Sequence, residues 1–426
     1  MSKKDRPGGV DRREFLQASA AATVGMAGMA QPTVAQAKDE PAPIQPFSIA
    51  VPEAVLGDLR DRLARTRYPD QLAGAAWTYG TELSYLKELC DYWRTRYDWR
   101  AQERALNRFD HFRTDIDGLG IHFIHQRSRQ KRATPLIVTH GWPGSVFELT
   151  KIIGPLSDPV AHGGRADDAF HVVCPSLPGY GFSDAPRQPG FGAKRVAEVF
   201  AKLMDRLGYT RYGAQGGDWG ALVSTWLARQ DAAHVCGIHL SMILAKPPEG
   251  PQSDAVEGPS PEEREALKKT QQGEETETGY AAIQSTKPQS LGYALNDSPA
   301  GLAAWIVEKF RQWSDCGGHV EKRFTKDELL TNIMIYWVTQ TITSSMRLYY
   351  ETRVSGWLEA LDEHIGVPTG CALFPVHPQL PRRWVENSYN VTRWTKMKSG
   401  GHFAALEEPG LLVEDIRGFF RDLRQG

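Results

Sequence analysis

An aspartate at the tip of a glycine-rich strand-to-helix turn is the first candidate for chemistry in this sequence. Gly216-Gly217-Asp218-Trp219-Gly220 follows an apolar strand and precedes a helical stretch over 221–228. Small residues let such a sharp turn pack, and the residue at its tip projects from a helix N-terminus, where an anion is stabilised. The pattern predicts that Asp218 is a nucleophile; the alternative is an ordinary helix cap. Because no Gly-x-Ser-x-Gly occurs in the chain, a serine hydrolase is disfavoured.

Two further turns carry groups that a nucleophilic aspartate needs. His140-Gly141-Trp142-Pro143-Gly144-Ser145 follows another apolar strand, and the backbone N–H of Trp142 is predicted to form an oxyanion hole with that of Trp219. His402 lies between the last predicted strand and the final helix, where a histidine can act as general base. Gly/Pro turns and structural histidines are common, so each signal is weak alone. Their order and spacing around Asp218 favour a hydrolase site.

The elements that position these turns alternate between strands and helices. From Phe112 the apolar pattern predicts a β-hairpin around Asp117-Gly118. Further strands are predicted over 135–139, 170–174, 211–215, 235–240, 371–374 and 391–398, and helices over 196–207, 221–228 and 411–423. This alternation predicts an α/β fold with a mostly parallel sheet and helices on both faces.

Two helical regions interrupt or precede that pattern. After a Pro/Ala-rich linker over 38–46, residues 47–112 show helical periods at 52–66, 83–93 and 101–109. The strand pattern also stops over 246–350, where a polar loop is predicted over 247–277 and helices over 301–313 and 329–346. We expect this insertion to be a lid over a sheet domain formed by residues 113–245 and 351–426.

The first 37 residues have the pattern of an export signal. Paired Arg12 and Arg13 precede Phe15 and Leu16, then an alanine-rich stretch ends in Ala35-Gln36-Ala37. The order resembles a twin-arginine leader, which predicts a bacterial protein exported to the periplasm or secreted. The stretch is too short and too weakly apolar to serve as a stable membrane anchor. The alternative is a disordered basic tail.

Composition limits the partners. The 426 residues carry 50 Lys and Arg against 51 Asp and Glu, so the net charge of −1 gives no field that would attract nucleic acid. The five cysteines lie far apart without a Cys-x-x-Cys pair, so we expect small buried residues and no metal site. The chain should act on a small molecule without a cofactor, and its oligomeric state stays open.

Five motifs extend these observations along the chain. They are His140-Gly141-Trp142-Pro143-Gly144-Ser145, Gly216-Gly217-Asp218-Trp219-Gly220, Ile283-Gln284-Ser285-Thr286-Lys287-Pro288, Ala294-Leu295-Asn296-Asp297-Ser298-Pro299 and Gly400-Gly401-His402-Phe403-Ala404-Ala405. With them the chain resembles the microsomal-type epoxide hydrolases from about Ile44 to Leu423. The resemblance implies an α/β-hydrolase fold with a helical lid and a helical N-terminal segment, and a role in detoxification.

The resemblance also implies a reaction and the residues that perform it. Asp218 would attack an oxirane carbon to form an alkyl ester, while Tyr280 and Tyr349 of the lid donate hydrogen bonds to the ring oxygen. His402 would then activate water against the ester, whose oxyanion meets the amides of Trp142 and Trp219. The substrates would be a small-molecule epoxide and water. The second tyrosine could instead be the adjacent Tyr350.

One position departs from the family pattern. The acid that orients the base should follow Phe374-Pro375 by two residues, and this chain has His377 there. The other position at which this fold can carry the acid, directly after the strand over 235–240, is occupied by Ser241. Either another carboxylate reaches His402, or ester hydrolysis is slow. The nearest candidates in sequence are Asp362, Glu363 and Glu386.

Two other functions stay open at this point. A haloalkane dehalogenase also combines an aspartate nucleophile, a following tryptophan, a histidine base and a helical lid, but it binds a leaving halide in place of a ring oxygen. A catalytically impaired homologue that only binds its ligand would explain His377. Diol formation would separate epoxide hydrolysis from both.

Overall fold

The computed structural model describes residues 42–246, 260–377 and 379–425. The predicted leader over 1–37 lies outside the described residues, as does the start of the predicted linker. The last part of that linker differs from the prediction, because Gln45–Pro46 forms a short strand against Phe112 and Arg113. Backbone pairing therefore joins the first described residues of the chain to the sheet.

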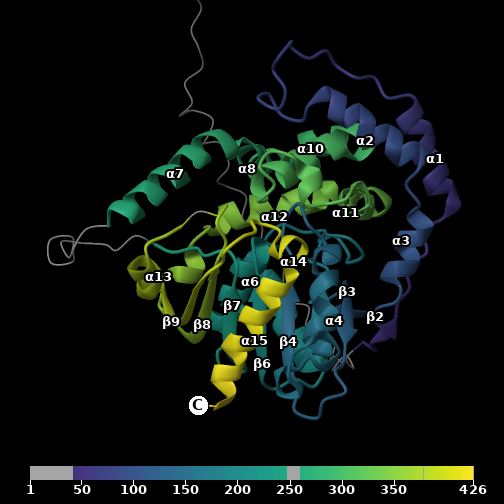
Figure 1. The fold of residues 1–426 in the computed structure, drawn as a ribbon. Coiled ribbons are helices and arrows are strands. Elements are labelled where there is room, and N and C mark those ends of the chain that lie inside the picture. Colours follow the sequence, from purple (N-terminus) through teal and green to yellow (C-terminus); the bar gives the residue numbers. More distant parts are fainter. Residues whose placement is uncertain (1–41, 247–259, 378, 426) are drawn as a thin grey trace, which may run out of the picture. The chain divides into compact units, whose positions relative to one another are not determined.

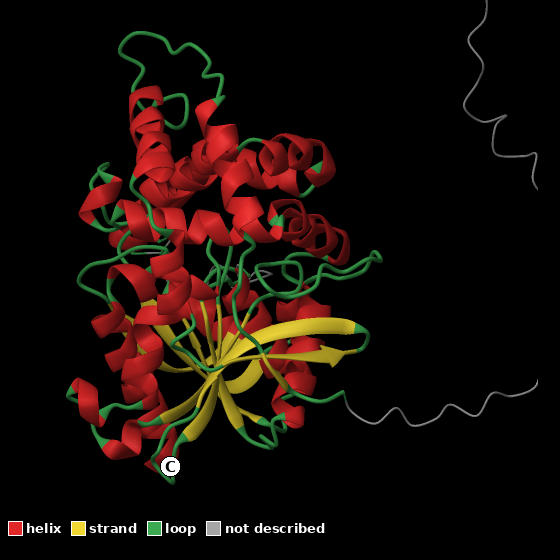
Figure 2. Cartoon of the chain, turned by 90° about the vertical axis from the view of Figure 1, so that its right-hand side faces the viewer, coloured by secondary structure: helices red, strands yellow, loops and turns green. Residues whose placement is uncertain are grey.

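One twisted sheet lies at the centre of the described chain (Figures 1 and 2). Its strands are β1 (Gln45–Pro46), β2 (His111–Ile116), β3 (Leu119–Gln126), β4 (Thr134–Thr139), β5 (Phe170–Pro175), β6 (Tyr212–Gly216), β7 (Val235–Leu240), β8 (Ile365–Leu373) and β9 (Tyr389–Lys396). They lie in the order β1-β2-β3-β5-β4-β6-β7-β8-β9. Pairing is antiparallel from β1 to β5 and parallel from β5 through β9, so the predicted mostly parallel sheet is confirmed.

The hairpin between β2 and β3 follows from two residues. Asp117 and Gly118 have φ angles of 55° and 79°, the positive values that a tight two-residue hairpin turn requires. Asn, Asp and Gly tolerate this region best. The local sequence therefore fixes the turn and, through it, the register of the hairpin.

Helices cover both faces of the sheet. They are α4 (Thr150–Ser157), α5 (Ala193–Arg206), α6 (Trp219–Gln230), α13 (Arg382–Ser388), α14 (Ala404–Glu407) and α15 (Pro409–Gln425). On one face, Phe420 of α15 lies so close to Gly213 of β6 that a Cβ there would overlap its ring. Helices α5 and α6 pack in the other apolar cluster, so the sheet is buried on both sides.

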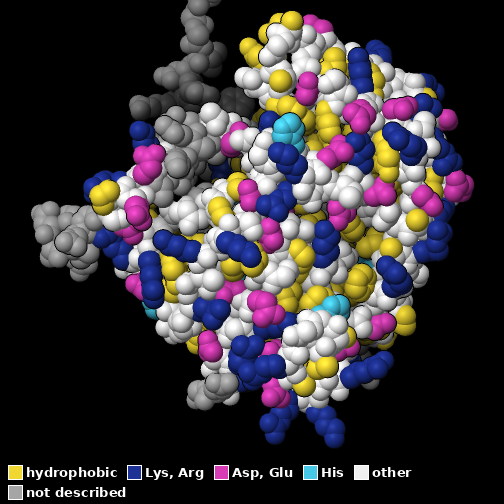
Figure 3. All heavy atoms as spheres, viewed as in Figure 1, with side chains coloured by type: hydrophobic (Ala, Val, Ile, Leu, Met, Phe, Trp, Pro, Cys, Tyr) yellow, Lys and Arg dark blue, Asp and Glu magenta, His cyan; other side chains and the backbone are white. Residues whose placement is uncertain are grey.

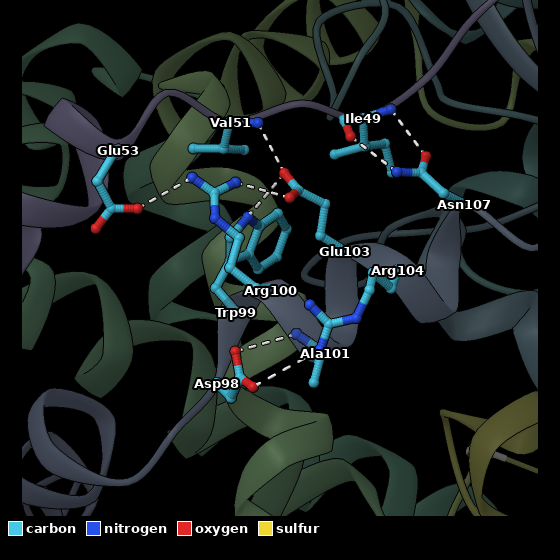
Figure 4. A network of polar contacts seen from close by, with 10 residues as sticks. All are labelled: Ile49, Val51, Glu53, Asp98, Trp99, Arg100, Ala101, Glu103, Arg104 and Asn107. Atoms are coloured by element: carbon cyan, nitrogen blue, oxygen red, sulfur yellow. Dashed lines mark hydrogen bonds and ion pairs between the residues drawn. The ribbon is translucent and has the colours of Figure 1, made fainter.

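The N-terminal segment consists of α1 (Glu53–Ala64), α2 (Leu83–Thr95) and α3 (Trp99–Leu106). Helix α3 begins two residues before the prediction because the Asp98 side chain accepts from the N–H of Ala101 and caps it. The buried Glu103 then accepts from Val51 N–H at 2.7 Å and from Trp99 Nε1 at 3.1 Å (Figure 4). Arg100 pairs with the same carboxylate at 2.7 Å. These bonds fix the start of the segment to its third helix.

The predicted lid is a group of helices inserted between β7 and β8. They are α7 (Pro261–Glu277), α8 (Gly279–Gln284), α9 (Pro288–Asp297), α10 (Pro299–Trp313), α11 (Lys326–Thr339) and α12 (Ile342–Ser355). Figure 1 shows these helices above one edge of the sheet. The turns that follow β4 and β6 lie at that edge, because both strands run parallel and end there.

The structure corrects three boundaries of this insertion. Residues 261–277 form a helix where a loop was predicted, because Ser260 and Glu263 form a capping box and Pro261 occupies the first turn. The helix predicted over 329–346 breaks at Gln340, whose φ is 54°. The sheet resumes at Ile365 rather than Cys371, since Gly366, Pro368 and Gly370 hide the strand pattern in the sequence.

The surface carries both charge signs side by side (Figure 3). Basic and acidic side chains alternate over the visible face, in line with the net charge of −1. No helix of the described residues combines the length and the apolar character that crossing a bilayer requires. The four cysteines Cys90, Cys174, Cys316 and Cys371 are buried, and Cys236 is half-buried.

Candidate active site

Asp218 occupies a strained turn between β6 and α6. Its backbone has φ 50° and ψ −126°, a region that side chains other than glycine rarely adopt. The turn needs its flanking glycines: a Cβ on Gly216 would overlap the backbone of Gly220, and one on Gly220 would overlap the carbonyl of Thr139. The packing of β4 against this turn therefore forces the Asp218 side chain out at the sheet edge.

Two backbone amides hold the Asp218 carboxylate. The N–H of Trp142 donates to Oδ1 at 2.8 Å, and the N–H of Trp219 also donates to the carboxylate. Burial raises the pKa of Asp218 to about 6, although both N–H groups act in the opposite direction. A Cβ on Gly141 would overlap the same carboxylate. The predicted oxyanion turn and nucleophile are thus in direct contact.

His402 lies across the carboxylate from these amides. Its Nε2 is 3.5 Å from Asp218 Oδ2, and its own backbone N–H donates to the carbonyl of Trp313 at 2.8 Å. Burial lowers the pKa of His402 to about 4, so the imidazole is neutral at neutral pH. A neutral imidazole keeps a lone pair with which it can take a proton from water.

His377, which occupies the position expected for the acid, lies next to His402. The rings of His377 and His402 have centroids 5.0 Å apart. Burial, with repulsion from His402, lowers the pKa of His377 to about 3, so His377 is also neutral at neutral pH. A neutral imidazole cannot supply the negative charge that a carboxylate would place beside the base.

None of the three carboxylates proposed from the sequence reaches this pair within the described chain. Asp362 pairs with Lys246 at 2.5 Å, Glu363 with Arg229 at 3.2 Å and Glu386 with Arg382 at 2.7 Å. All three side chains are exposed on the surface. Of the two alternatives that the sequence left open, the one in which Asp362, Glu363 or Glu386 orients His402 is wrong, because each of these side chains pairs with a basic residue at the surface.

The lid places two tyrosines against Trp142 and Trp219, whose amides hold Asp218. Tyr280 of α8 stacks on Trp142 at 5.1 Å, and Tyr349 of α12 meets the edge of Trp219 at 4.7 Å. The side chains of the two tyrosines are hydrogen-bonded to each other. Burial raises the pKa of both phenols, which therefore stay protonated. Tyr349 is 3% exposed and Tyr350 is 37% exposed, so Tyr349 is the one that faces the site.

Helix α10 contributes two residues that the sequence reasoning missed. The ammonium of Lys309 lies 5.0 Å from the ring centroid of Tyr280 and pairs with Glu308 at 2.7 Å. The ring of Trp313 lies 5.0 Å from that of Tyr280 and 4.8 Å from that of His402. Lys309 and Trp313 are four residues apart, so they lie on the same face of the helix. This spacing is visible in the sequence and could have identified them as a pair.

Helix α11 is bonded to the oxyanion turn. The amide of Asn332 donates to the carbonyl of Pro143 at 2.7 Å, and its oxygen accepts from the hydroxyl of Ser145 at 2.8 Å. The hydroxyl of Tyr336 donates to the carbonyl of Gly144 at 2.6 Å. All these groups are buried, so the lid fixes the backbone that presents the Trp142 amide.

A cavity of about 910 Å³ lies between residues 66–83 of the N-terminal segment and helix α10. Tyr280 and Lys309 form part of its wall, together with the aromatic side chains of Trp77 and Trp305. The cavity therefore gives a space of ligand size beside Tyr280. No group of His, Cys, Asp and Glu that could hold a metal occurs among the described residues.

Known proteins resemble this chain over most of its length. A family model for the epoxide hydrolase N terminus matches residues 44–149, and a model for the alpha/beta hydrolase fold matches residues 134–267. Epoxide hydrolase 1 of Sus scrofa is 43% identical over 417 residues, which cover 92% of this chain and 91% of that protein.

Two solved structures share the fold. The juvenile hormone epoxide hydrolase of the silkworm Bombyx mori has a TM-score of 0.83 and 34% identity, with 90% of this chain and 95% of that chain covered. The epoxide hydrolase of Aspergillus niger has a TM-score of 0.80 and 31% identity, with 90% and 97% covered.

Proposed function

Because the chain belongs to the epoxide hydrolase family and hydrolyses an epoxide to a vicinal diol, we propose that the reaction proceeds through an ester on Asp218. The observation that carries this proposal is the position of the Asp218 carboxylate, held between two amides and facing the neutral imidazole of His402. Such a carboxylate can attack carbon, and its ester carbonyl then already lies in an oxyanion hole.

In the first step, Asp218 attacks one ring carbon and the bond from that carbon to the ring oxygen breaks. Negative charge develops on the leaving oxygen, and the hydroxyls of Tyr280 and Tyr349 stabilise it by hydrogen bonding and proton donation. The contact of the two rings with Trp142 and Trp219, whose amides hold Asp218, supports this role. The charge of Asp218 also adds to burial in raising the pKa of both phenols. A tyrosine pair suits an oxygen leaving group and favours an epoxide over a haloalkane.

In the second step, water attacks the ester carbonyl while His402 takes a proton from it. The oxyanion that forms accepts from the Trp142 and Trp219 amides, and its collapse releases the diol and restores the Asp218 carboxylate. His377 cannot stabilise the imidazolium as a carboxylate would. We therefore expect ester hydrolysis to be the slower step, with a burst of epoxide consumption before the steady state.

A single turnover in heavy-oxygen water tests the ester. The label should appear in the peptide that contains Asp218, because the attacking water oxygen stays on the carboxylate when the ester is hydrolysed. Label found only in the diol of the first turnover would show direct attack by water and refute the mechanism. Asp218→Ala should abolish diol formation, while Asp362→Ala, at an exposed carboxylate, should leave the rate unchanged.

We also infer export from the residues over 1–37, which lie outside the described residues. The support is the order of Arg12 and Arg13, an alanine-rich stretch and Ala35-Gln36-Ala37. In a bacterium with a twin-arginine system, fractionation should find the protein outside the cytoplasm. Replacing both arginines with lysine should retain it inside, and equal export of the two forms would contradict the proposal.

A further inference from the structure

The chain just after helix α10 of the lid lies against the loop that carries the base. The N–H of His402 donates to the carbonyl of Trp313 at 2.8 Å, and the N–H of Gly400 donates to Oδ2 of Asp315 at 3.1 Å. A Cβ on Gly401 would overlap the Trp313 carbonyl, so the two backbones are in direct contact. The lid therefore fixes where the backbone of the base lies.

The side chain of Glu407 joins the same two segments. Its Oε1 accepts from the N–H of Phe403 at 3.0 Å, and its Oε2 accepts from the N–H of Asp315 at 2.8 Å. The N–H of Glu407 in turn donates to the carbonyl of Phe403 at 2.9 Å. Because Phe403 follows His402 directly, one carboxylate holds both the neighbour of the base and the lid segment beside it.

Glu407 is 8% exposed, and in the described part of the chain it forms no ion pair with a basic side chain. The guanidinium of Arg323 pairs instead with Asp315 at 2.7 Å and with Glu408 at 2.8 Å. Burial raises the pKa of Glu407 to about 7, while the two N–H groups and the charge of Arg323 act in the opposite direction. Above that pH both oxygens act as acceptors, and each has a backbone N–H as its donor.

The ring of His402 needs such support. Within the described residues no carboxylate other than that of Asp218 pairs with it, and the adjacent His377 is an imidazole whose ring centroid lies 5.0 Å away. Once the backbone is fixed, a histidine has only its side-chain torsions left, and packing must limit them. The rings of Trp313 and Phe403 do so, with centroids 4.8 Å and 5.0 Å from that of His402. Both flanking rings belong to the two joined segments.

We propose that Glu407 is a positioning residue for His402, because it bonds the loop of the base to the lid and so gives the imidazole the orientation that an acid beside the ring usually provides. The inference rests on the ester mechanism proposed above. In that mechanism alkylation requires Asp218 and the lid tyrosines, and the base acts only on the ester. Glu407 supplies orientation without a proton transfer of its own. Its loss should therefore slow hydrolysis and leave alkylation almost unchanged.

Glu407→Gln is the direct test, because it preserves the size of the side chain but leaves only one oxygen. That oxygen can accept from one N–H group, and the new NH₂ group then faces the other N–H without an acceptor. In rapid mixing at pH 8, where the Glu407 carboxylate is ionised, ester hydrolysis should be slower by ~10- to 100-fold and alkylation should stay within about 3-fold of wild type. Intact-mass spectra should show the alkylated enzyme accumulating.

Glu103→Gln is the matched control. Glu103 is also 8% exposed, and its carboxylate also accepts from two N–H groups, those of Val51 and of the Trp99 ring. It lies in the N-terminal segment, so its substitution should lower the thermal midpoint of unfolding, as Glu407→Gln does, but leave both half-reactions unchanged. Glu407→Asp keeps the charge on a side chain too short to reach both N–H groups. Its hydrolysis rate should fall between wild type and Glu407→Gln, and it decides the question if Glu407→Gln does not fold.

Restoring an acid beside the ring tests orientation itself. His377→Glu gives the imidazole a second constraint, so adding it to Glu407→Gln should recover most of the lost hydrolysis, whereas a general loss of stability would not be recovered. A folded Glu407→Gln enzyme that hydrolyses the ester at the wild-type rate, or that loses both half-reactions equally, would overturn the inference alone. So would a loss that His377→Glu leaves unchanged. Absence of alkylated Asp218 in every form would overturn the ester mechanism as well.

Discussion

The lid side and the base side of the active site differ in how completely they match the chemistry required of them. On the lid side, Tyr280 is half-buried against Trp142 and Tyr349 is buried against Trp219, and both phenols lie close enough to Asp218 to be affected by its charge. On the base side, His402 has an imidazole beside it where a carboxylate would be expected. Under the proposed mechanism, the groups for the first half-reaction match the chemistry required of them, while the base of the second lacks the carboxylate that would usually orient it.

The two sides also differ in what holds them. Stacked and edge-to-face aromatic rings define the lid side, and a substitution there changes contacts within a dense cluster. The base side is held by backbone hydrogen bonds, from His402 N–H to Trp313 and from Phe403 N–H to Glu407. Within the described residues, no carboxylate other than that of Asp218 pairs with the ring of His402. Separate kinetic measurements of the two steps can test each side independently.

The largest effect is expected on the base side. His402→Gln removes the group that deprotonates water, so ester hydrolysis should fall by at least ~1,000-fold while alkylation proceeds. Intact-mass spectrometry should then detect an enzyme heavier by one substrate molecule. An unmodified His402→Gln enzyme after prolonged incubation with epoxide would show that this residue acts in alkylation, and the division between the two sides would be lost.

The next effect belongs to the lid side. Tyr280→Phe and Tyr349→Phe each remove one donor to the ring oxygen and should slow alkylation by ~10- to 100-fold, leaving hydrolysis of a preformed ester unchanged. Tyr350→Phe is the matched control, because this neighbour is exposed and should have no effect. Stopped-flow tryptophan fluorescence can follow the first step. Equal losses from Tyr349→Phe and Tyr350→Phe would contradict the assignment.

The pH dependence of alkylation sharpens the comparison further. The pKa of Asp218 is raised to about 6, so the nucleophile becomes protonated, and inactive, as the pH falls through that value. At pH 5 the alkylation rate should be ~10-fold below its plateau at neutral pH. His402, with a pKa of about 4, stays neutral through this range and cannot cause the loss. A flat rate between pH 5 and 7 would refute this assignment.

The smallest effect is a gain. His377→Glu places a carboxylate beside His402, and we expect the steady-state rate to rise several-fold as hydrolysis accelerates, while the alkylation rate stays the same. The burst of substrate consumption should shrink accordingly. A wild-type enzyme that turns over without a burst, and gains nothing from this substitution, would show that the base side is already complete.

The parts of the site that the sequence predicts are those formed locally. Asp218, Trp219 and His402 belong to short strand–turn–helix motifs, where a few glycines dictate the path of the chain over several residues. The mostly parallel sheet was likewise predictable, because buried strands appear as short apolar runs between helices. Strand β8 was partly missed because its glycines and proline interrupt the run.

Long-range packing determines what the sequence did not predict. Lys309 and Trp313 appear in the sequence as ordinary residues of a helix, and only the packing of α10 places them beside Tyr280 and His402. Asp362, Glu363 and Glu386 failed as candidates for the opposite reason, because each found a basic partner on the surface. Burial and pairing are properties of the assembled chain, which local patterns do not encode.

The hydrogen bonds from α11 to the oxyanion turn separate the lid into a part that supports the active-site backbone and a part that lines the cavity. Asn332 and Tyr336 hold the carbonyls beside Trp142, so any drift in the position of α11 would disturb the amide that binds the ester oxyanion. Residues 66–83 and the part of α10 that faces them line the cavity, and among the described residues the hydrogen bond from the Thr81 hydroxyl to the carbonyl of Ala304 joins these two segments to each other. Substitutions there change the wall of the cavity and leave the hydrogen bonds to the oxyanion turn in place, whereas substitutions at Asn332 or Tyr336 remove them.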